Sequence, residues 1–324
     1  MHAVFASRFR FALAVLAATV GALLATQPAW SYPWPIRPFD NQHAVRGTFD
    51  DPRSLRGLID ITLDNPLSFH SGVDIQAPDG TRVYAIASGI ATEPNRAAVA
   101  VSSPFLSPFA PLVFGYWHII PAVTRGQYVS AGQLLGYVRP GADHVHLAER
   151  RFGVYVDPLR RGGLSPYVDD TAPVVRGLVA YRCGKKDALD TQALSGCVDL
   201  AVDAYDPPPI TPQAPWSAVV LSPVRITWSG LFGSSWRPAG FQVRTVDFRR
   251  LLTVPLRDVY APGTRQNCAH AVGDYRYWLA RGLDTNALGD GQHAISVSVT
   301  DARGNVRDAG LRFTVANAPE PAGP

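Results

Sequence analysis

The stretch FHSGVDIQAPDGTRVYAIASGIA, residues 69–91, decides the fold class of the first half of the chain. Its apolar residues alternate with polar ones in short runs, and Gly, Pro and Asp separate these runs. This alternation is typical of half-buried β-strands joined by tight turns. It continues through GYWHIIPAVTRGQYVSAGQLLGYV, residues 115–138, and DHVHLAERRFGVYVDPL, residues 143–159. We therefore predict an all-β, antiparallel fold without a long amphipathic helix.

Histidine and aspartate residues in these stretches form a candidate site. His144 and His146 lie two residues apart, and on a strand such residues point to the same face about 6.6 Å apart. His70 and Asp74 would lie about 13 Å apart on a regular strand, which is too far for them to share one ion. The Ser-Gly pair between them allows a turn or bulge. We therefore predict that the chain bends between His70 and Asp74.

Two histidines and one aspartate with an open fourth position suit a catalytic zinc ion. A structural zinc site is instead closed by four protein ligands, which usually include Cys. The first cysteine of this chain is Cys183, far beyond these stretches. We therefore predict Zn²⁺ as the cofactor and no metal site built on thiolates.

The three quoted stretches resemble the LytM/lysostaphin-type zinc endopeptidases over about residues 43 to 160. That family holds its zinc with an H-x-x-x-D motif and the second His of an H-x-H motif. The resemblance implies a peptidase core with an open groove, of the duplicated-hybrid-motif type, and peptidoglycan peptides as the substrate. It also implies ligand roles for His70, Asp74 and His146, a proton-transfer role for His144, and transition-state stabilisation by His118.

The chain divides into four predicted segments. Residues 1–29 read as a secretory signal, because Arg residues precede an apolar run that is shorter than the ~20 residues of a membrane span. Residues 30–167 form the predicted peptidase domain, residues 168–317 an immunoglobulin-like β-sandwich, and residues 318–324 a disordered tail. We therefore expect a secreted, periplasmic or extracellular protein whose mature form has no membrane span.

The predicted sandwich ends with GQHAISVSVTDARGNVRDAGLRFTV, residues 291–315. This stretch reads as two alternating strands joined by a turn at DARGN, an ending typical of immunoglobulin-like domains. No aromatic binding platform is evident in this half. Four tryptophans are therefore predicted to belong to its core: Trp216, Trp228, Trp236 and Trp278.

Three cysteines, Cys183, Cys197 and Cys268, all lie in the second half. Cys183 closes one apolar segment and Cys197 opens the next, so the two bracket a loop between neighbouring strands. An oxidising compartment favours a disulfide between them. Cys268 is then expected to remain a free thiol.

Other functions are alternatives to a zinc peptidase. A formal net charge of +4 and a pI near 9.0 come without a basic helix or stripe, which argues against nucleic acid as a partner. A cupin site also uses H-x-H, but the further residues that it needs are missing. A noncatalytic member of the same family, which binds peptidoglycan or activates another hydrolase, is the main alternative. An adhesion or carbohydrate-binding role for the second half is a further hypothesis.

The sequence alone does not assign the roles of several further residues or identify protein partners. Glu149 and Asp143 are candidates to orient a histidine through its second ring nitrogen. His43, His270 and His293 are interpreted as ordinary surface or hydrogen-bonded residues. A protein regulator is possible for such a hydrolase, and the sequence does not predict an oligomeric state.

Overall fold

The computed structural model describes residues 31–54, 67–104, 111–232, 235–236, 243–247 and 249–317. The predicted signal, residues 1–29, and the predicted tail, residues 318–324, lie outside these residues. Within them, no helix is both long and apolar enough to span a membrane. The regular structure is almost entirely antiparallel strands, which confirms the predicted all-β fold class.

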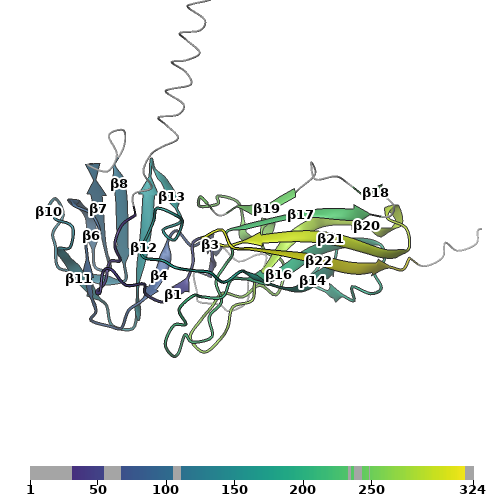
Figure 1. Cartoon of the computed structure of the whole chain (residues 1–324), viewed down its shortest axis with the longest axis horizontal. Coiled ribbons are helices and arrows are strands. Elements are labelled where there is room, and N and C mark those ends of the chain that lie inside the picture. Colours follow the sequence, from purple (N-terminus) through teal and green to yellow (C-terminus); the bar gives the residue numbers. More distant parts are fainter. Residues whose placement is uncertain are drawn as a thin grey trace, which may run out of the picture.

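The first half of the chain forms the sheets at the left of Figure 1, in purple to teal. Its largest sheet has eight strands in the order β1-β4-β12-β8-β7-β6-β10, with β13 on the free part of β12. These strands are β1 (Val45–Gly47), β4 (Val73–Gln76), β6 (Gly89–Asn95), β7 (Ala98–Ser103), β8 (Leu112–Trp117), β10 (Tyr128–Val129), β12 (His144–Arg151) and β13 (Val154–Val156). A smaller sheet contains β5 (Arg82–Tyr84), β11 (Leu134–Val138) and β9 (Ile119–Pro121), and a separate pair is β2 (Pro52–Ser54) with β3 (Leu67–Phe69).

Strand β12 explains why the site lies on this sheet. It pairs with β4 on one side and with β8 on the other. Val145 and Leu147 are fully buried in the hydrophobic core of this half. Because side chains alternate between the faces of a strand, His144 and His146 point to the opposite face. The register places His146 across from Asp74 of β4, so the polar residues of both strands share that face.

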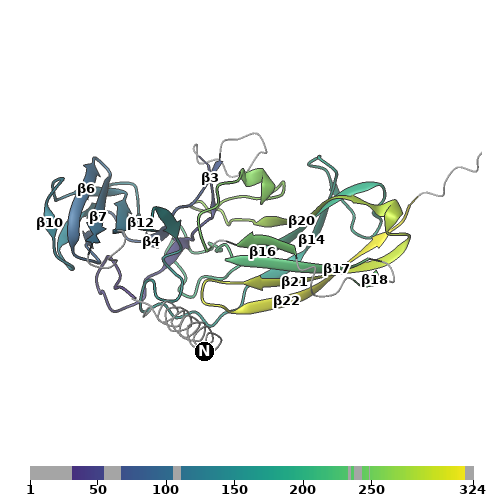
Figure 2. The same ribbon diagram turned by 90° about the horizontal axis from the view of Figure 1, so that it is seen from above.

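The second half forms two sheets, seen at the right of Figure 1 and from above in Figure 2. One sheet has the order β15-β14-β16-β20, and the other β18-β17-β21-β22 with β19 beside β17. Side chains of β16 and β21 belong to one shared core, so the two sheets pack face to face. The strands are β14 (Val174–Arg182), β15 (Ala188–Leu189), β16 (Cys197–Tyr205), β17 (Arg225–Phe232), β18 (Ser235–Trp236), β19 (Val243–Asp247), β20 (Arg276–Asp284), β21 (Gly291–Thr300) and β22 (Val306–Val315).

The sandwich shares two features with the predicted immunoglobulin-like domain, its terminal hairpin and its two-sheet arrangement. The predicted terminal hairpin is present as β21 and β22, which pair over their full length from Gly291 with Val315 to Thr300 with Val306. An immunoglobulin-like domain likewise distributes its strands over two antiparallel sheets that share one core. The strand order is compatible with such a domain, and the assignment of this half to that class stays a prediction.

The two halves contact one another at several points. The hydroxyl of Tyr260 donates to the carbonyl of Asp50 (3.0 Å), and the amide of Ser222 donates to Thr48 Oγ1 (3.0 Å). Leu221 of the second half belongs to the hydrophobic core of the first. No strand is formed between β13 and β14, over residues 157–173, where the boundary between the domains is predicted.

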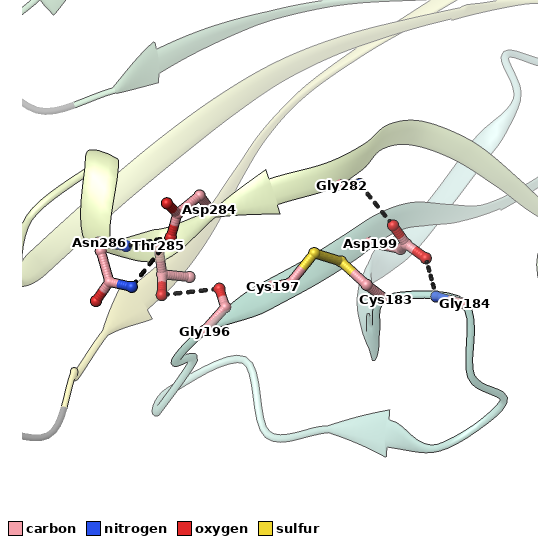
Figure 3. Close-up of a disulfide and its surroundings, with 9 residues drawn as sticks. All are labelled: Cys183, Gly184, Gly196, Cys197, Asp199, Gly282, Asp284, Thr285 and Asn286. Carbon is pink, nitrogen blue, oxygen red and sulfur yellow. Dashed lines mark hydrogen bonds between the residues drawn. A yellow bond between two sulfur atoms is a disulfide. The ribbon is translucent and has the colours of Figure 1, made fainter.

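The disulfide between Cys183 and Cys197 is present, as predicted from the sequence (Figure 3). It joins the residue after β14 to the first residue of β16, with the two Cα atoms 5.4 Å apart. This distance lies within the usual range for disulfides. Asp199 accepts hydrogen bonds from the amides of Gly184 and Gly282 beside the bond. Cys268 remains a free, half-buried cysteine.

Removing this crosslink should destabilise the second half. Its sequence separation is 14 residues, and closure of such a loop constrains the unfolded chain by roughly 3 kcal/mol. We expect a Cys183→Ser, Cys197→Ser double variant to lose about that much free energy of unfolding in urea titrations. Cys268→Ser serves as the matched control and should unfold like the parent protein. Equal losses in both variants would contradict this role of the crosslink.

Candidate metal and catalytic site

His70 reaches the site because the chain bends where the sequence predicts it. Strand β3 ends at Phe69 and β4 begins at Val73, and the backbone between them turns at Gly72. A Cβ atom at Gly72 would lie 2.2 Å from the carbonyl oxygen of Leu147, so only glycine permits this close approach. The bend brings His70 Nε2 to within 3.1 Å of Asp74 Oδ1.

Three donor atoms converge on one point at this face of the sheet. His146 Nδ1 lies 3.3 Å from Asp74 Oδ1 and 2.7 Å from His70 Nε2. All three residues are buried, with 4% to 8% of their surface exposed. Tetrahedral zinc with bonds of about 2.0–2.2 Å requires ligand atoms roughly 3.3 Å apart. The donor types and their spacing therefore fit a zinc ion held by His70, Asp74 and His146.

Neighbouring groups orient the ligand atoms toward this point. His70 Nδ1 lies 2.7 Å from the carbonyl oxygen of Thr48, which can only accept a hydrogen bond. A nitrogen of Arg53 also lies 2.9 Å from Nδ1, so both neighbours hold this edge of the ring and turn Nε2 toward the metal position. Arg53 lies 3.0 Å from Asp74 Oδ2 and so turns Oδ1 toward the site. The sequence did not single out Arg53 for this role.

The protonation states also suit metal binding. Burial lowers the pKa of His70 to about 3 and lowers that of His146, so both rings are neutral ligands near pH 7. Burial alone would raise the pKa of Asp74, but its electrostatic interactions with His70, Arg53 and His144 outweigh the effect of burial. The net result is a pKa well below the usual range, and Asp74 is a carboxylate.

His144 and His118 lie side by side next to these three residues. Their ring centroids are 4.4 Å apart, and His144 Nε2 is 3.4 Å from Asp74 Oδ1. His144 Nδ1 lies 2.6 Å from the carbonyl oxygen of Ala142, while Nε2 is the ring nitrogen on the side of Asp74. His118 follows β8 with a positive φ of 65°, and burial lowers its pKa to about 4.

An arginine that the sequence did not assign to the site adjoins His144, and a tryptophan packs on this arginine. Arg46 of β1 donates to the carbonyl of Ala142 (3.2 Å) and lies 2.5 Å from His144 Nδ1. Its guanidinium stacks over the ring of Trp216, 4.0 Å from the centroid. The core prediction for Trp216 is therefore wrong, because this residue of the second half is half-buried beside the site. Trp228 and Trp278 are buried as predicted, and the side chain of Trp236 lies outside the described residues.

The suggested orienting roles of Glu149 and Asp143 are not found. Asp143 is exposed, and its recorded hydrogen bonds involve only its backbone. Glu149 is fully buried on the core side of β12, where it accepts hydrogen bonds from Tyr32, Arg151 and Arg160. The alternation of the strand explains the difference, because Glu149 shares the face of Leu147 and not that of the histidines.

Glu149 should therefore matter for stability. Removal of its carboxylate leaves Arg160 without its buried counter-charge, and breaking such a pair costs about 3–5 kcal/mol. We expect Glu149→Ala to lose about that much free energy of unfolding in urea titrations, because the group is fully buried. The matched control, Asp143→Asn at an exposed position, should change it by less than about 0.5 kcal/mol. A loss of that small size in Glu149→Ala would contradict the structural role.

Comparisons with known proteins cover the part of the chain that holds the site. Residues 68–158 match the model of peptidase family M23. The catalytic domain of lysostaphin, an antimicrobial peptidase from Staphylococcus simulans, is 25% identical, with 28% of this chain and 77% of that chain covered and a TM-score of 0.24. A chain of the SpoIIQ-SpoIIIAH pore-forming complex is 20% identical, with 40% and 90% covered and a TM-score of 0.31. No curated protein matches the chain.

The family match and the site coincide in the sequence. The matched segment contains all five residues of the site, His70, Asp74, His118, His144 and His146. These residues stand in the order of the H-x-x-x-D and H-x-H motifs, and the fold brings them together on one sheet face. The match of residues 68–158 to peptidase family M23 thus supports the resemblance to LytM/lysostaphin-type peptidases that the motifs of this segment indicate.

Proposed function

We propose that this protein is a secreted, zinc-dependent endopeptidase that hydrolyses peptide bonds in bacterial peptidoglycan. The observation that carries the proposal is the convergence of His70 Nε2, Asp74 Oδ1 and His146 Nδ1, with two further histidines beside them. Peptidases of family M23 supply the expectation of a zinc cofactor and of a cell-wall substrate.

The ligand set leaves a position free for chemistry. When bound by three protein ligands, zinc lowers the pKa of a water molecule to about 7 and polarises a carbonyl group. His70, Asp74 and His146 would hold the ion, and Thr48 and Arg53 would keep two of these ligands in place. Buried and neutral imidazoles need no proton removed before they bind, so the site is ready for metal near neutral pH.

His144 would move the proton in this mechanism. Its Nδ1 is held by the carbonyl of Ala142, and its Nε2 faces Asp74 at the centre of the site. Nε2 can therefore accept a proton from the attacking water and deliver it to the leaving amine nitrogen. Arg46 would keep the imidazole in this orientation, because its guanidinium lies beside Nδ1 and is itself stacked on Trp216.

His118 would stabilise the negative charge that develops on the scissile carbonyl oxygen. It stands next to His144, and its ring lies at right angles to that of His146, with the centroids 6.3 Å apart. A ring N–H aimed at the oxyanion acts only in the transition state, which is how such donors accelerate a reaction.

A noncatalytic role in binding peptidoglycan or activating another hydrolase is the alternative. It would be favoured by a site that lacks one of the five residues, and this chain retains all of them in one cluster. We therefore favour catalysis.

Digestion of purified sacculi of several crosslink types tests the proposal. Mass spectrometry of the released peptides should identify new amino termini at one kind of peptide bond, either a D-alanyl crosslink or a glycine bridge. His144→Ala, purified in parallel, is the control for contaminating hydrolases. Intact sacculi of every type, with zinc bound to the protein, would overturn catalysis in favour of the binding role.

A further inference from the structure

We infer that the protein has a second metal site, built only from carboxylate oxygens, that binds a calcium ion where the second domain meets the first. Three aspartates from distant parts of the sequence form it. Asp169 lies in the connection before β14, Asp206 directly after β16, and Asp301 directly after β21. One carboxylate oxygen of each residue lies within 4.8 Å of those of the other two.

These carboxylates are buried, which separates them from an ordinary acidic surface patch. The exposed fractions of Asp169, Asp206 and Asp301 are 6%, 4% and 3%. Among the described residues, none of the three forms an ion pair with Lys, Arg or His. The nearby Arg303 instead donates to the carbonyl oxygens of Tyr167 and Leu159. A buried carboxylate is stable only beside a compensating positive charge or hydrogen-bond donor. Three neighbouring carboxylates also repel one another, so a positive partner is needed here.

Asp206 points specifically to a missing ligand. Its Oδ1 atom is buried and has no hydrogen-bond partner. The other two side chains are held by hydrogen bonds. Asp169 accepts from the amide of Thr171, and Asp301 accepts from the amides of Arg303, Gly304 and Asn305 and from the side-chain nitrogen of Asn305. The site is thus positioned by its surroundings, while one buried oxygen is left without a donor. A bound cation would satisfy that oxygen.

The pKa of Asp206 also reflects its burial and the two neighbouring acidic groups. Burial first, and then the charges of Asp301 and Asp169, raise the pKa of Asp206 to about 9. A bound cation would remove the mutual repulsion of the three carboxylates.

The donor set indicates which cation fits. The three residues offer only oxygen, whereas the zinc site offers two imidazole nitrogens and one oxygen. Oxygen donors suit hard cations, and Ca²⁺ tolerates the irregular, flexible coordination that carboxylates, carbonyls and water provide. Mg²⁺ demands a near-ideal octahedron and retains its water more strongly, so calcium is the better candidate.

The site has a structural consequence for the peptidase half. Asp206 pairs with Leu221 through two backbone hydrogen bonds, and the loop between them carries Trp216, which stacks with Arg46, the neighbour of His144. In Figure 1 the β21–β22 turn, which begins with Asp301, lies at the end of the sandwich that faces the first half. A cation at this position would fix the base of that loop and the connection between the two domains.

Calorimetric titration of the full chain tests the inference. The protein is stripped with a chelator, reloaded with one equivalent of zinc, and titrated with CaCl₂. We expect one calcium ion per chain, with a Kd between about 10⁻⁶ and 10⁻³ M. The melting temperature should rise by about 5 °C at saturating calcium. MgCl₂ should bind more weakly.

Matched variants locate the ion. Asp206→Asn should weaken calcium binding at least about 10-fold, since it removes one ligand charge. Asp308→Asn makes the same change at an exposed position of β22 and should bind calcium like the parent protein. Asp169→Asn provides a second ligand variant should Asp206→Asn fail to fold. Absence of calcium binding to the parent protein at about 10 mM, tighter binding of magnesium, or normal calcium binding in both ligand variants would overturn the inference.

Discussion

We expect the loss of most bound zinc and of all peptide hydrolysis in each of three variants, His70→Ala, Asp74→Ala and His146→Ala. Each change removes one of three atoms that converge at distances of 2.7 to 3.3 Å, and two ligands do not hold a catalytic zinc ion firmly. Zinc content per chain, measured by mass spectrometry of the purified proteins, and the rate of sacculus cleavage check both effects together.

The control for these ligand variants is a histidine elsewhere in the same domain. His43 bonds to the carbonyl of Pro38 and takes no part in the metal cluster. His43→Ala should therefore retain both zinc and activity. A His70→Ala, Asp74→Ala or His146→Ala protein with one full equivalent of zinc and undiminished cleavage would contradict the ligand assignment.

The His144→Ala protein should keep about one zinc ion per chain and still lose roughly 10² to 10⁴ in rate, the usual cost of removing a general base. His144 Nε2 approaches only Asp74 among the three ligands, at 3.4 Å, so its removal leaves the ligand atoms in place. His118→Ala should likewise keep zinc and lose roughly 10² to 10³ in kcat, if it donates to the oxyanion. Metal analysis beside steady-state cleavage of a crosslinked peptide measures both.

The outcome within the H-x-H pair is especially informative. His144 and His146 share one face of β12, so their positions on the strand alone do not separate a ligand from a base. Their contacts do, because His146 Nδ1 meets both other ligands whereas His144 Nδ1 is occupied by Ala142. A His144→Ala protein without zinc, beside a His146→Ala protein with zinc, would reverse the two roles.

The grouping of these side chains could be predicted from the sequence because local patterns determine most of it. Alternation along β12 places His144 and His146 on one face, and the flexible Ser-Gly pair predicts the bend that brings His70 to Asp74. The same alternation, applied to Glu149, would have placed this residue on the core side. Glu149 is separated from His144 and His146 by an odd number of sequence positions, and this spacing indicates the opposite face of the strand.

Contacts between distant segments could not be predicted in this way. Arg46 and Trp216 are 170 residues apart in the sequence and contact one another in the structure. No strand periodicity links a residue of the first half to a loop of the second. The grouping of Asp169, Asp206 and Asp301 likewise depends on how two sheets and a connection meet. The disulfide was predictable because its two cysteines bracket neighbouring strands, so local order alone brought them together.

Zinc titration of the chelator-stripped protein measures directly whether peptide hydrolysis depends on one bound zinc ion. Aliquots receive increasing zinc, and cleavage of a peptidoglycan crosslink peptide is followed in each. We expect no cleavage without metal and a rate that rises in proportion to zinc until one equivalent is bound at His70, Asp74 and His146. Cleavage that is unchanged by removal of zinc, or a protein that binds one equivalent and cleaves no peptidoglycan peptide, would contradict this expectation.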